Sequence, residues 1–260
     1  MGLYSKLKEN MEKYSGCTDF LYNIYGLDEK EEYEAIILAP SWKPEKIFKN
    51  FNVKIELVKS GPYYNGYVLQ SGNKKYGYIQ TSAGAPCIVD CCLTLGSAKC
   101  NKIIFVGAVG ALKEDMRLGD IITPSESIAG DGASLYLQEE ICSSNFHKIV
   151  HPKQHIKENA INIARNIGIE MKEKVVYCTD SIFCEYLHLN EILELGSEAI
   201  EMETSAFYRC MEIMNKDGIA ILCVSDNSAT QNALVGRSDE DTETFHRSRE
   251  TLIPKLILSL

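Results

Sequence analysis

Three carboxylates in the C-terminal third of the chain have types and spacings that could support acid–base or hydrogen-bonding chemistry. Glu201 and Glu203 flank Met202, and residues at i and i+2 share one face of an extended chain. Asp226 follows closely on the apolar run 219–224, which is typical of a buried strand. Acids that end buried strands lie at the carboxyl edge of an α/β sheet, where ligands bind. The alternative is that Glu201 and Glu203 begin a helix and favour its dipole, with Asp226 as a turn residue.

Alternating strands and helices must position these acids. Buried strands are predicted over residues 34–39, 102–106, 174–178, 199–202 and 219–225. Antiparallel strands are predicted over residues 53–58, 63–70 and 75–80. Helices are predicted to open in 41–48 and to cover residues 87–98, 155–167, 191–195, 205–211 and 238–258. Alternation of this kind predicts a single α/β domain around a mixed, largely parallel sheet.

We expect this domain to span residues 33–260, after a helical N-terminal extension over residues 1–32. The longest irregular stretches are 126–155 and 227–240. Loops of this length often cover a functional site, so both are candidates for that role.

Composition argues against several classes of protein. The 260 residues are 45% hydrophobic and 24% charged, which permits a large core. A net charge of -9 argues against a nucleic-acid binder, which needs a basic stripe. Apolar runs stay well short of the roughly 20 residues of a membrane span, and residues 1–8 lack the apolar stretch of a secretory signal. We therefore expect a cytoplasmic protein with neither nucleic acid nor membrane as a partner.

The 10 cysteines do not predict a disulfide framework. Cys178, Cys210 and Cys223 lie inside apolar runs, where cysteine behaves as a small buried hydrophobe. The sequence has no CxxC pair, and its five histidines do not have zinc spacing. We expect a reduced protein without a metal.

Several short motifs accompany the predicted elements. They are 37–40 (Ile-Leu-Ala-Pro), 82–86 (Ser-Ala-Gly-Ala-Pro), 106–111 (Val-Gly-Ala-Val-Gly-Ala), 118–121 (Leu-Gly-Asp-Ile), 131–134 (Asp-Gly-Ala-Ser), 201–203 (Glu-Met-Glu) and 225–226 (Ser-Asp). Their order and spacing over residues 34–258 resemble the nucleoside phosphorylase/nucleosidase superfamily. This group includes purine nucleoside phosphorylases, uridine phosphorylases and methylthioadenosine/S-adenosylhomocysteine nucleosidases. The resemblance implies a three-layer fold and a homo-oligomer, either a dimer or a hexamer.

The resemblance also implies a role for each acid. Glu203 would accept hydrogen bonds from the ribose 2′- and 3′-hydroxyls, Met202 would form the apolar wall under the sugar, and Glu201 would lie near the base. Phe183 would stack on the base, with a core aromatic as the alternative. Asp226 would protonate or hydrogen-bond purine N7, and it favours a purine because uridine phosphorylases lack an acid there.

Ser82, Gly107 and Ala108 belong to the two glycine-bearing motifs, and by the same resemblance they would contact the substrate, a small-molecule nucleoside. No cofactor is implied. The cosubstrate would be water or inorganic phosphate.

The phosphate pocket of the family's phosphorylases is altered in this chain. That pocket uses a glycine and an arginine after the first strand, and an arginine and a serine around the second. The matching positions here are Ser41, Glu45, Phe105 and Ala108. Bidentate arginine–phosphate recognition is therefore lost, and a carboxylate beside phosphate would be repulsive.

In the nucleosidases the residue that matches Glu45 is a glutamate that activates the attacking water. We therefore expect hydrolysis, with Glu45 as the base, Glu203 on the ribose and Asp226 on the leaving base. Glu45 could instead be an ordinary acid in the first turn of a helix. Two other functions stay open. One is a phosphorylase that uses Lys43, Lys46 or an arginine from a neighbouring subunit, and the other is a catalytically weak nucleoside-binding or regulatory protein.

Overall fold

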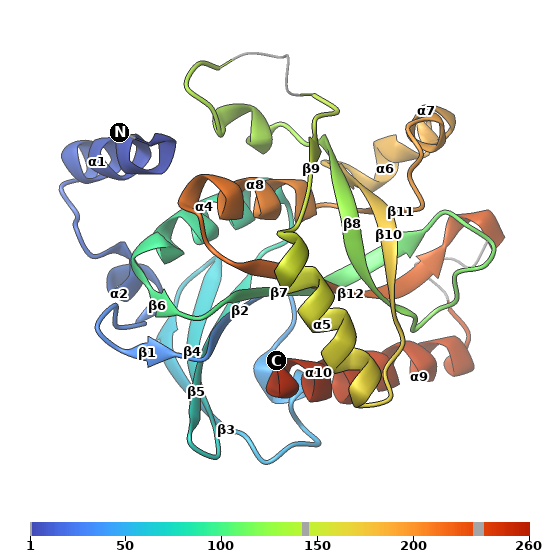
Figure 1. The fold of residues 1–260 in the computed structure, drawn as a ribbon, viewed down its shortest axis with the longest axis horizontal. Coiled ribbons are helices and arrows are strands. Elements are labelled where there is room, and N and C mark those ends of the chain that lie inside the picture. The colour runs from blue at the N-terminus through green and yellow to red at the C-terminus, as the bar shows by residue number, and fades with distance from the viewer. Residues whose placement is uncertain (1, 142–145, 231–236) are drawn as a thin grey trace.

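A ten-stranded mixed sheet runs through the molecule, and helices cover both of its faces (Figure 1). The computed structural model describes residues 2–141, 146–230 and 237–260. Its strands are β1 (Glu32–Tyr33), β2 (Ala35–Pro40), β3 (Lys54–Ser60), β4 (Tyr64–Ser71), β5 (Lys74–Thr81), β6 (Lys99–Cys100), β7 (Ile103–Ala111), β8 (Ile121–Gly130), β9 (Ile149–Val150), β10 (Met171–Thr179), β11 (Ala199–Glu201) and β12 (Gly218–Asn227). The large sheet has the order β11-β10-β8-β12-β7-β2-β5-β4-β3, with β9 beside β8, whereas β1 and β6 form a separate pair.

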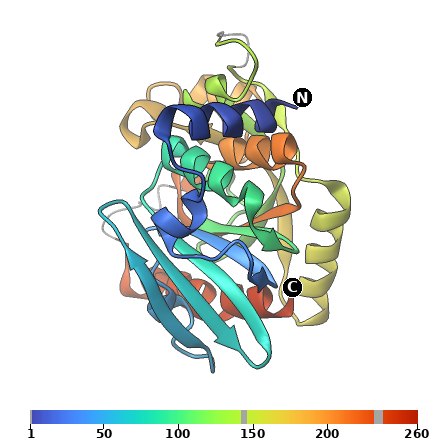
Figure 2. The same cartoon turned by 90° about the vertical axis from the view of Figure 1, so that its left-hand side faces the viewer.

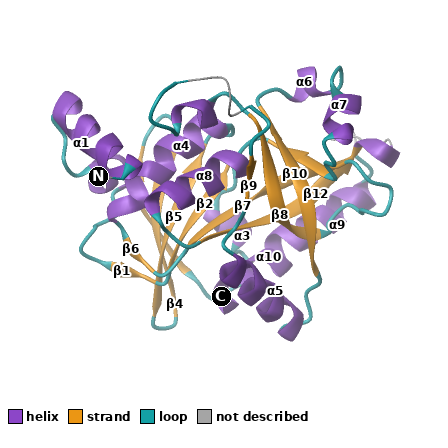
Figure 3. Cartoon of the chain, turned by 45° about the horizontal axis from the view of Figure 1, so that its top comes forward, coloured by secondary structure: helices purple, strands orange, loops and turns teal. Residues whose placement is uncertain are grey.

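Ten α-helices are found among the described residues. They are α1 (Leu3–Ser15), α2 (Phe20–Tyr25), α3 (Pro44–Ile47), α4 (Ala85–Thr94), α5 (Gln154–Asn166), α6 (Ile182–Glu185), α7 (Leu189–Glu194), α8 (Thr204–Met214), α9 (Asp239–Arg247) and α10 (Ile253–Ser259). Helices α4 and α8 cover one face of the sheet, and α5, α9 and α10 cover the other (Figure 3). The prediction of a three-layer α/β domain with a mixed sheet is confirmed.

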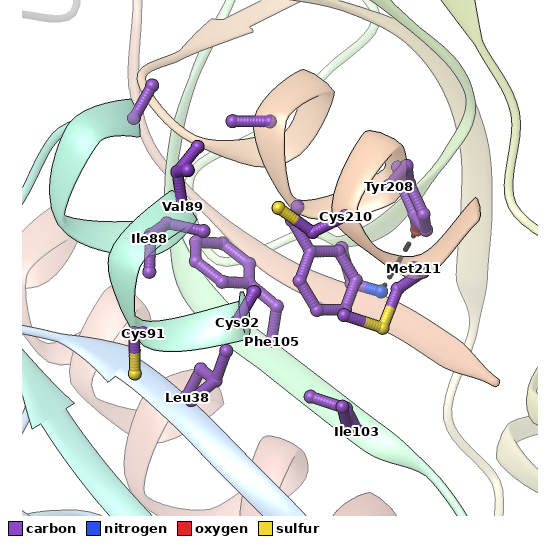
Figure 4. Packing of buried hydrophobic residues seen from close by; sticks show 14 of the residues in the cluster. Leu38, Ile88, Val89, Cys91, Cys92, Ile103, Phe105, Tyr208, Cys210 and Met211 are labelled. Carbon is purple, nitrogen blue, oxygen red and sulfur yellow. Dashed lines mark hydrogen bonds between the residues drawn. The ribbon is translucent and has the colours of Figure 1, made fainter. Parts of the chain in front are cut away.

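The continuous apolar runs form strands that are buried on both faces. In β7, Ile103 and Phe105 pack into the cluster under α4 and α8, while Ile104 and Val106 pack into the cluster under α5 and α10. This division follows from the two-residue period of a strand. Figure 4 shows Phe105 between residues of α4 and α8. Full burial of such a side chain contributes about 1.5–3 kcal/mol.

Five strands of the sheet close into a ring. β11 pairs in parallel with β10 and, on its other side, antiparallel with β7. Because β7 also pairs with β12, β12 with β8 and β8 with β10, the path returns to β11. This closure brings the ends of β7, β11 and β12 to one place, although they are far apart in the sequence.

A β-bulge changes the direction of the last residues of β12. The pairing of β12 with β7 shifts its register between Val224 and Asp226, so that Ser225 is an extra residue in β12. Bulges of this kind re-aim a side chain and are common beside active sites. Both Ser225 and Asp226 line the same cavity as a result.

The start of one predicted loop is a strand. Residues 126–130 of the predicted 126–155 loop belong to β8. Pro124 and the polar residues beside it concealed this strand, because proline lacks a backbone N–H. The structure accommodates Pro124 next to a register shift in the β8–β10 pairing. Residues 142–145 and 231–236 of the two predicted loops lie outside the described residues.

The predicted final helix over residues 238–258 is interrupted. α9 and α10 are separated by a π-helical segment over Ser248–Leu252. Pro254 lies near the start of α10 and cannot donate a helical hydrogen bond, which accounts for the break.

The N-terminal helices differ in how deeply they are packed. Leu21 and Tyr25 of α2 are buried in the same core as α4, and the rings of Tyr25 and Tyr64 meet edge to face at 5.4 Å. Helix α1 has no buried residue and lies outside α4 and α8 (Figure 2), where the Tyr4 hydroxyl donates to the Leu93 carbonyl. The boundary at residue 32 stays a prediction. In the described ranges, every helix is too short or too polar to span a bilayer.

Candidate active site

A cavity of about 230 Å³ lies where β2, β7, β11 and β12 end. Four carboxyl groups form part of its wall, those of Glu185, Glu201, Glu203 and Asp226. All four are buried, with 9%, 6%, 6% and 9% of their surface exposed. Most of the remaining wall is apolar, so the carboxyl groups are the main polar features that a ligand would meet.

Glu203 is held by a backbone amide from another part of the chain. The Gly84 N–H donates to Glu203 Oε1 at 2.6 Å. Gly84 has φ 105°, a conformation that favours glycine, and it immediately precedes α4. Burial raises the pKa of Glu203, while the Gly84 amide and a hydrogen bond with Glu201 lower it. The protein therefore fixes Oε1 of this carboxyl group in place.

Glu201 is engaged mainly with the start of α8. Its carboxyl oxygens accept hydrogen bonds from the backbone amides of Glu203 and Thr204 and from the Thr204 hydroxyl, at 2.7–3.0 Å. This arrangement satisfies orphan amides of the helix. Burial, together with the charge of Glu203, raises the pKa of Glu201 to about 8. Glu201 is thus the last residue of β11, it accepts hydrogen bonds from the start of α8, and it also borders the cavity.

Asp226 faces the cavity from the bulge of β12. The Ser225 hydroxyl donates to Asp226 Oδ1 at 2.6 Å. Asp226 packs closely against Gly110 of β7, where a Cβ would lie 3.1 Å from Oδ2. Burial raises the pKa of Asp226, and the Ser225 hydroxyl and the Arg237 charge oppose this rise. The Arg237 guanidinium donates to the Ser225 carbonyl at 3.0 Å.

Helix α6 presents different residues to the cavity from those that the sequence predicted. Phe183 is 91% exposed and is not part of the cavity wall, so its stacking on a base stays a prediction. Ser181 caps α6, and Ile182, Glu185 and Tyr186 then share one face at i, i+3 and i+4. Phe183 does not belong to this face of α6, and its side chain is exposed.

Glu185 is the acid that sequence reasoning missed. Burial and the charge of Asp226 raise its pKa to about 7. The serine cap at Ser181 was the available signal, because it sets which residues of the short helix share a face.

Glu45 lies outside the cavity wall. Pro44 and Ile47 of the one-turn helix α3 point inward, and Glu45 is exposed. Its carboxylate is near the hydroxyl of Tyr67, whose pKa is raised by burial and by the charge of Glu45. Glu45 therefore does not meet the other three predicted acids in the cavity.

Of the remaining predicted site residues, some line the cavity and one does not. Met202, Gly107 and Ala108 line the cavity, whereas Ser82 does not, although its neighbour Ala83 does. The Ser82 amide instead donates to the Tyr63 carbonyl at 3.2 Å, which directs this residue toward β4.

The positions that would bind phosphate in a phosphorylase carry no cation. Phe105 is completely buried, and its ring lies 5.6 Å from that of Phe207. Ser41 lines the cavity with a positive φ of 60°, a conformation usually left to glycine. In the described part of the chain, no lysine or arginine lines this cavity.

The described residues contain no group of three or more histidine, cysteine, aspartate or glutamate side chains arranged to hold a metal ion. The described cysteines are free thiols, and Cys178, Cys210 and Cys223 are buried as predicted.

Comparison with known proteins gives a consistent picture. A family model described as "Phosphorylase superfamily" matches residues 29–259. The DeoD-type purine nucleoside phosphorylase of Mycoplasma pneumoniae is 27% identical over 146 residues, which cover 55% of this chain and 59% of that protein. The DeoD-type enzyme of Mycoplasma genitalium is 24% identical over 213 residues, which cover 79% and 87%. The match to the first relative thus spans less than two thirds of its length.

Solved structures share the fold. Uridine phosphorylase from Vibrio fischeri has a TM-score of 0.71 at 18% identity, covering 90% of this chain and 93% of that one. The methylthioadenosine/S-adenosylhomocysteine nucleosidase of Campylobacter jejuni has a TM-score of 0.67 at 13% identity, covering 88% and 100%. A futalosine hydrolase mutant of Helicobacter pylori has a TM-score of 0.64 at 15% identity, covering 87% and 100%. Both phosphorylases and hydrolases therefore share this architecture.

Proposed function

The chain belongs to the phosphorylase superfamily, and from that premise we propose that it hydrolyses the N-glycosidic bond of a purine nucleoside. In this reaction the C1′–N9 bond breaks and its electron pair passes to the base, which takes a proton at its purine edge. The oxygen of water joins C1′, and a proton of that water is lost. The products are the free base and ribose.

The observation that carries the choice of water is the charge of the cavity wall. Four carboxyl groups line the cavity, and no lysine or arginine does so among the described residues. Phosphate binding needs cationic or N–H donors, and a carboxylate beside phosphate raises its free energy. A neutral acceptor such as water meets no such penalty.

We assign the ribose to Glu203. The Gly84 amide fixes one of its oxygens, which supports a role for the other as acceptor for the sugar hydroxyls. Cleavage places positive charge on the ribosyl ring, and a pre-positioned carboxylate stabilises that charge. Met202 supplies an apolar wall of the same cavity.

We assign the leaving base to Asp226. Its side chain is buried and its pKa is raised, so it can hold or share a proton closer to neutral pH than an exposed aspartate. General acid catalysis of this kind contributes about 10²–10⁴-fold. Ile182 and Tyr186, rather than Phe183, supply the neighbouring apolar contacts.

Glu45 is the base that the family resemblance suggests for activating water. A general base must come within hydrogen-bond reach of the proton it takes. Because Glu45 is exposed outside the wall, we propose that the cavity carboxylates can support hydrolysis without it. Turnover of a Glu45→Gln variant separates these two assignments.

The deciding experiment is incubation of the purified protein with inosine, adenosine and methylthioadenosine, with and without inorganic phosphate. We expect free base and free sugar at rates that phosphate does not change. A strict requirement for phosphate, with ribose 1-phosphate as the product, would overturn the hydrolytic assignment. That outcome is the second candidate function, favoured by the similarity to DeoD-type purine nucleoside phosphorylases.

We also propose that the protein is a homo-oligomer. Phe183 and Leu187 are 91% and 83% exposed beside the cavity, and apolar side chains grouped in this way favour burial against another subunit. A sedimentation experiment that gives only the monomer mass at micromolar concentration would contradict this.

A further inference from the structure

Two hydroxyl groups at the start of α8 bind to residues in or next to β8. The Thr204 and Ser127 hydroxyls lie 2.8 Å apart, and because Thr204 donates to Glu201 Oε1, Ser127 is the donor in this contact. The Ser205 hydroxyl donates to Asp131 Oδ2 at 2.5 Å. Ser127 and Asp131 are four residues apart, so they share one face of the extended chain. We call these two residues the β8 anchors.

The β8 anchors are buried in a tightly packed place. Ser127 and Asp131 have 0% of their surface exposed, and so do their partners on α8. Gly130, just before Asp131, packs so closely on β10 that a Cβ there would lie 2.2 Å from the Tyr177 hydroxyl oxygen. The end of β8 therefore has little room to move, and it gives α8 a fixed point of attachment.

Stability alone does not account for the carboxyl group of Asp131. Its Oδ1 accepts a hydrogen bond from the Ser134 amide at 2.7 Å, and its Oδ2 accepts from the hydroxyls of Ser134 and Ser205 at 2.9 and 2.5 Å. These partners are neutral, although a buried charge is best balanced by a cation. Replacing buried charged groups by apolar residues is often neutral or stabilising. The contribution of Asp131 is therefore more to the position of α8 than to stability.

Glu203 directly precedes the two residues that the β8 anchors hold. It is the N-cap residue of α8, and its carbonyl accepts the Phe207 N–H at 2.9 Å. Its carboxyl group lines the cavity and accepts the hydrogen bond from Gly84. A shift at Thr204 or Ser205 therefore moves this carboxyl group. A misplacement of about 1 Å at a reacting group can cost about 10²-fold in rate.

We propose that Ser127 and Asp131 are positioning residues that act on the substrate through Glu203. They hold the start of α8 so that the Glu203 carboxyl group stays where it meets the ribose hydroxyls. Neither anchor lines the cavity, so neither acts on the substrate directly. This inference rests on the proposed function in that Glu203 binds the sugar, and it gives the 131–134 motif a role in the site.

The chain offers a matched pair of substitutions for the test. Ser205→Ala and Ser134→Ala each remove one hydroxyl hydrogen bond to Asp131 Oδ2, but only Ser205 belongs to α8. Because the lost bonds are alike, the midpoint of thermal unfolding should fall by similar amounts in the two variants. Release of base is measured from adenosine and from 2′,3′-dideoxyadenosine, which lacks the hydroxyls assigned to Glu203.

Ser205→Ala should lower kcat/KM for adenosine by about 10-fold or more, and for the dideoxynucleoside by less than about 3-fold, because only adenosine has the hydroxyls that Glu203 binds. Ser134→Ala should change both values by less than about 3-fold. Ser127→Ala should show the same selective loss with the hydrogen bonds of Asp131 intact. It also serves as the second variant if Ser205→Ala does not fold.

Equal losses of adenosine turnover in Ser205→Ala and Ser134→Ala would overturn the proposal. A loss in Ser205→Ala that is as large for the dideoxynucleoside as for adenosine would do the same, because it would show a general loss of structure and not an action through Glu203. Unchanged adenosine turnover in folded Ser205→Ala and Ser127→Ala would also refute the role of the anchors.

Failure of this proposal is distinct from failure of the proposed function. A strict requirement for phosphate would refute hydrolysis alone, because the same ratios are then measured with phosphate present. If the wild type releases no base, calorimetric titration with the two nucleosides gives affinities in place of kcat/KM. A selective loss of adenosine affinity in Ser205→Ala would then support the anchors and refute the hydrolase, whereas equal affinities of the wild type for the two nucleosides would refute both.

Discussion

Replacing Glu203 by glutamine should abolish most turnover while leaving the fold intact. The Gly84 N–H donates to Glu203 Oε1 at 2.6 Å, and it will bind the amide oxygen of the variant in the same way. The amide NH₂ is then turned toward the place of the sugar hydroxyls, so that donors face donors. The variant loses the acceptor for the ribose and the negative charge beside the ribosyl cation together.

The size of the effect can be worked from these contacts. Hydrogen bonds to a charged group contribute about 1.5–3 kcal/mol each, and neutral ones about half as much. Losing two such bonds and the charge raises the barrier by about 3–5 kcal/mol, which at about 1.4 kcal/mol per tenfold is a loss of about 10²–10⁴ in kcat/KM. Because burial raises the pKa of Glu203, neutralising it should not lower stability.

The assay is release of free base from a purine nucleoside, with thermal unfolding measured in parallel. Glu212→Gln is the matched control, since Glu212 is on the same helix α8 but is exposed and paired with Arg209. It should keep turnover within about 2-fold of the wild type, as a surface ion pair contributes little. If Glu203→Gln is folded and retains turnover within about 10-fold, Glu203 does not act on the substrate and the assignment of the site is wrong.

Three further predictions follow from the described positions. Glu45→Gln should keep turnover within about 10-fold because its carboxylate is outside the cavity wall, and a loss of about 100-fold or more would make Glu45 the general base. Ile182→Ala should raise KM for the nucleoside by about 10-fold through lost apolar contact, while Phe183→Ala should change KM by less than about 2-fold in the monomer; the opposite ranking would place Phe183 on the base. The free energy of unfolding should fall as pH rises from about 4.5 to 8, because the folded state holds protons on Glu185 and Glu201, whose pKa values are raised to about 7 and about 8, and the unfolded chain does not. Denaturant titrations across this range measure the slope, which Glu201→Gln should reduce, and an unchanged slope in that variant would contradict the raised pKa.

The strands and the family were predictable from local patterns. Continuous apolar runs predicted β2, β7, β10 and β12 because both faces of these strands are covered. Glu201, Glu203 and Asp226 were predicted to meet because the ends of buried strands share one edge, and all three border the cavity. Their functional roles remain proposals.

Other parts of the site depend on geometry that local patterns do not contain. The β11–β7 pairing joins residues about ninety positions apart, and it arises from long-range closure of the sheet. The bulge at Ser225 changes the direction of Asp226 without any glycine or proline to signal it. At α6, the face of the helix that turns toward the cavity carries Ile182 and Glu185, and Phe183 is not on that face.

The exposure of Glu45 also depends on packing that the local sequence pattern does not contain. The sequence predicted a helix opening after the first strand, and Pro44 lies in its first turn as expected. Which face of that single turn would be buried depends on Ile47 and Phe48 packing beneath the sheet. That packing leaves Glu45 outside the cavity wall, although its place in the sequence predicted a position in the active site.

The pairing of β11 with β7 also determines which edge of the sheet could pair with a strand of another chain. At one end of the nine-strand order, β11 is joined back to β7. At the other end, β3 is the one long outer strand in the part of the chain that the structure describes. Unpaired amides and carbonyls along such a strand invite a second chain to add to it, and charged side chains oppose this. Lys54, Glu56 and Lys59 are spread along β3 and are exposed, so this flank is protected from fibril-like growth by charge rather than by burial.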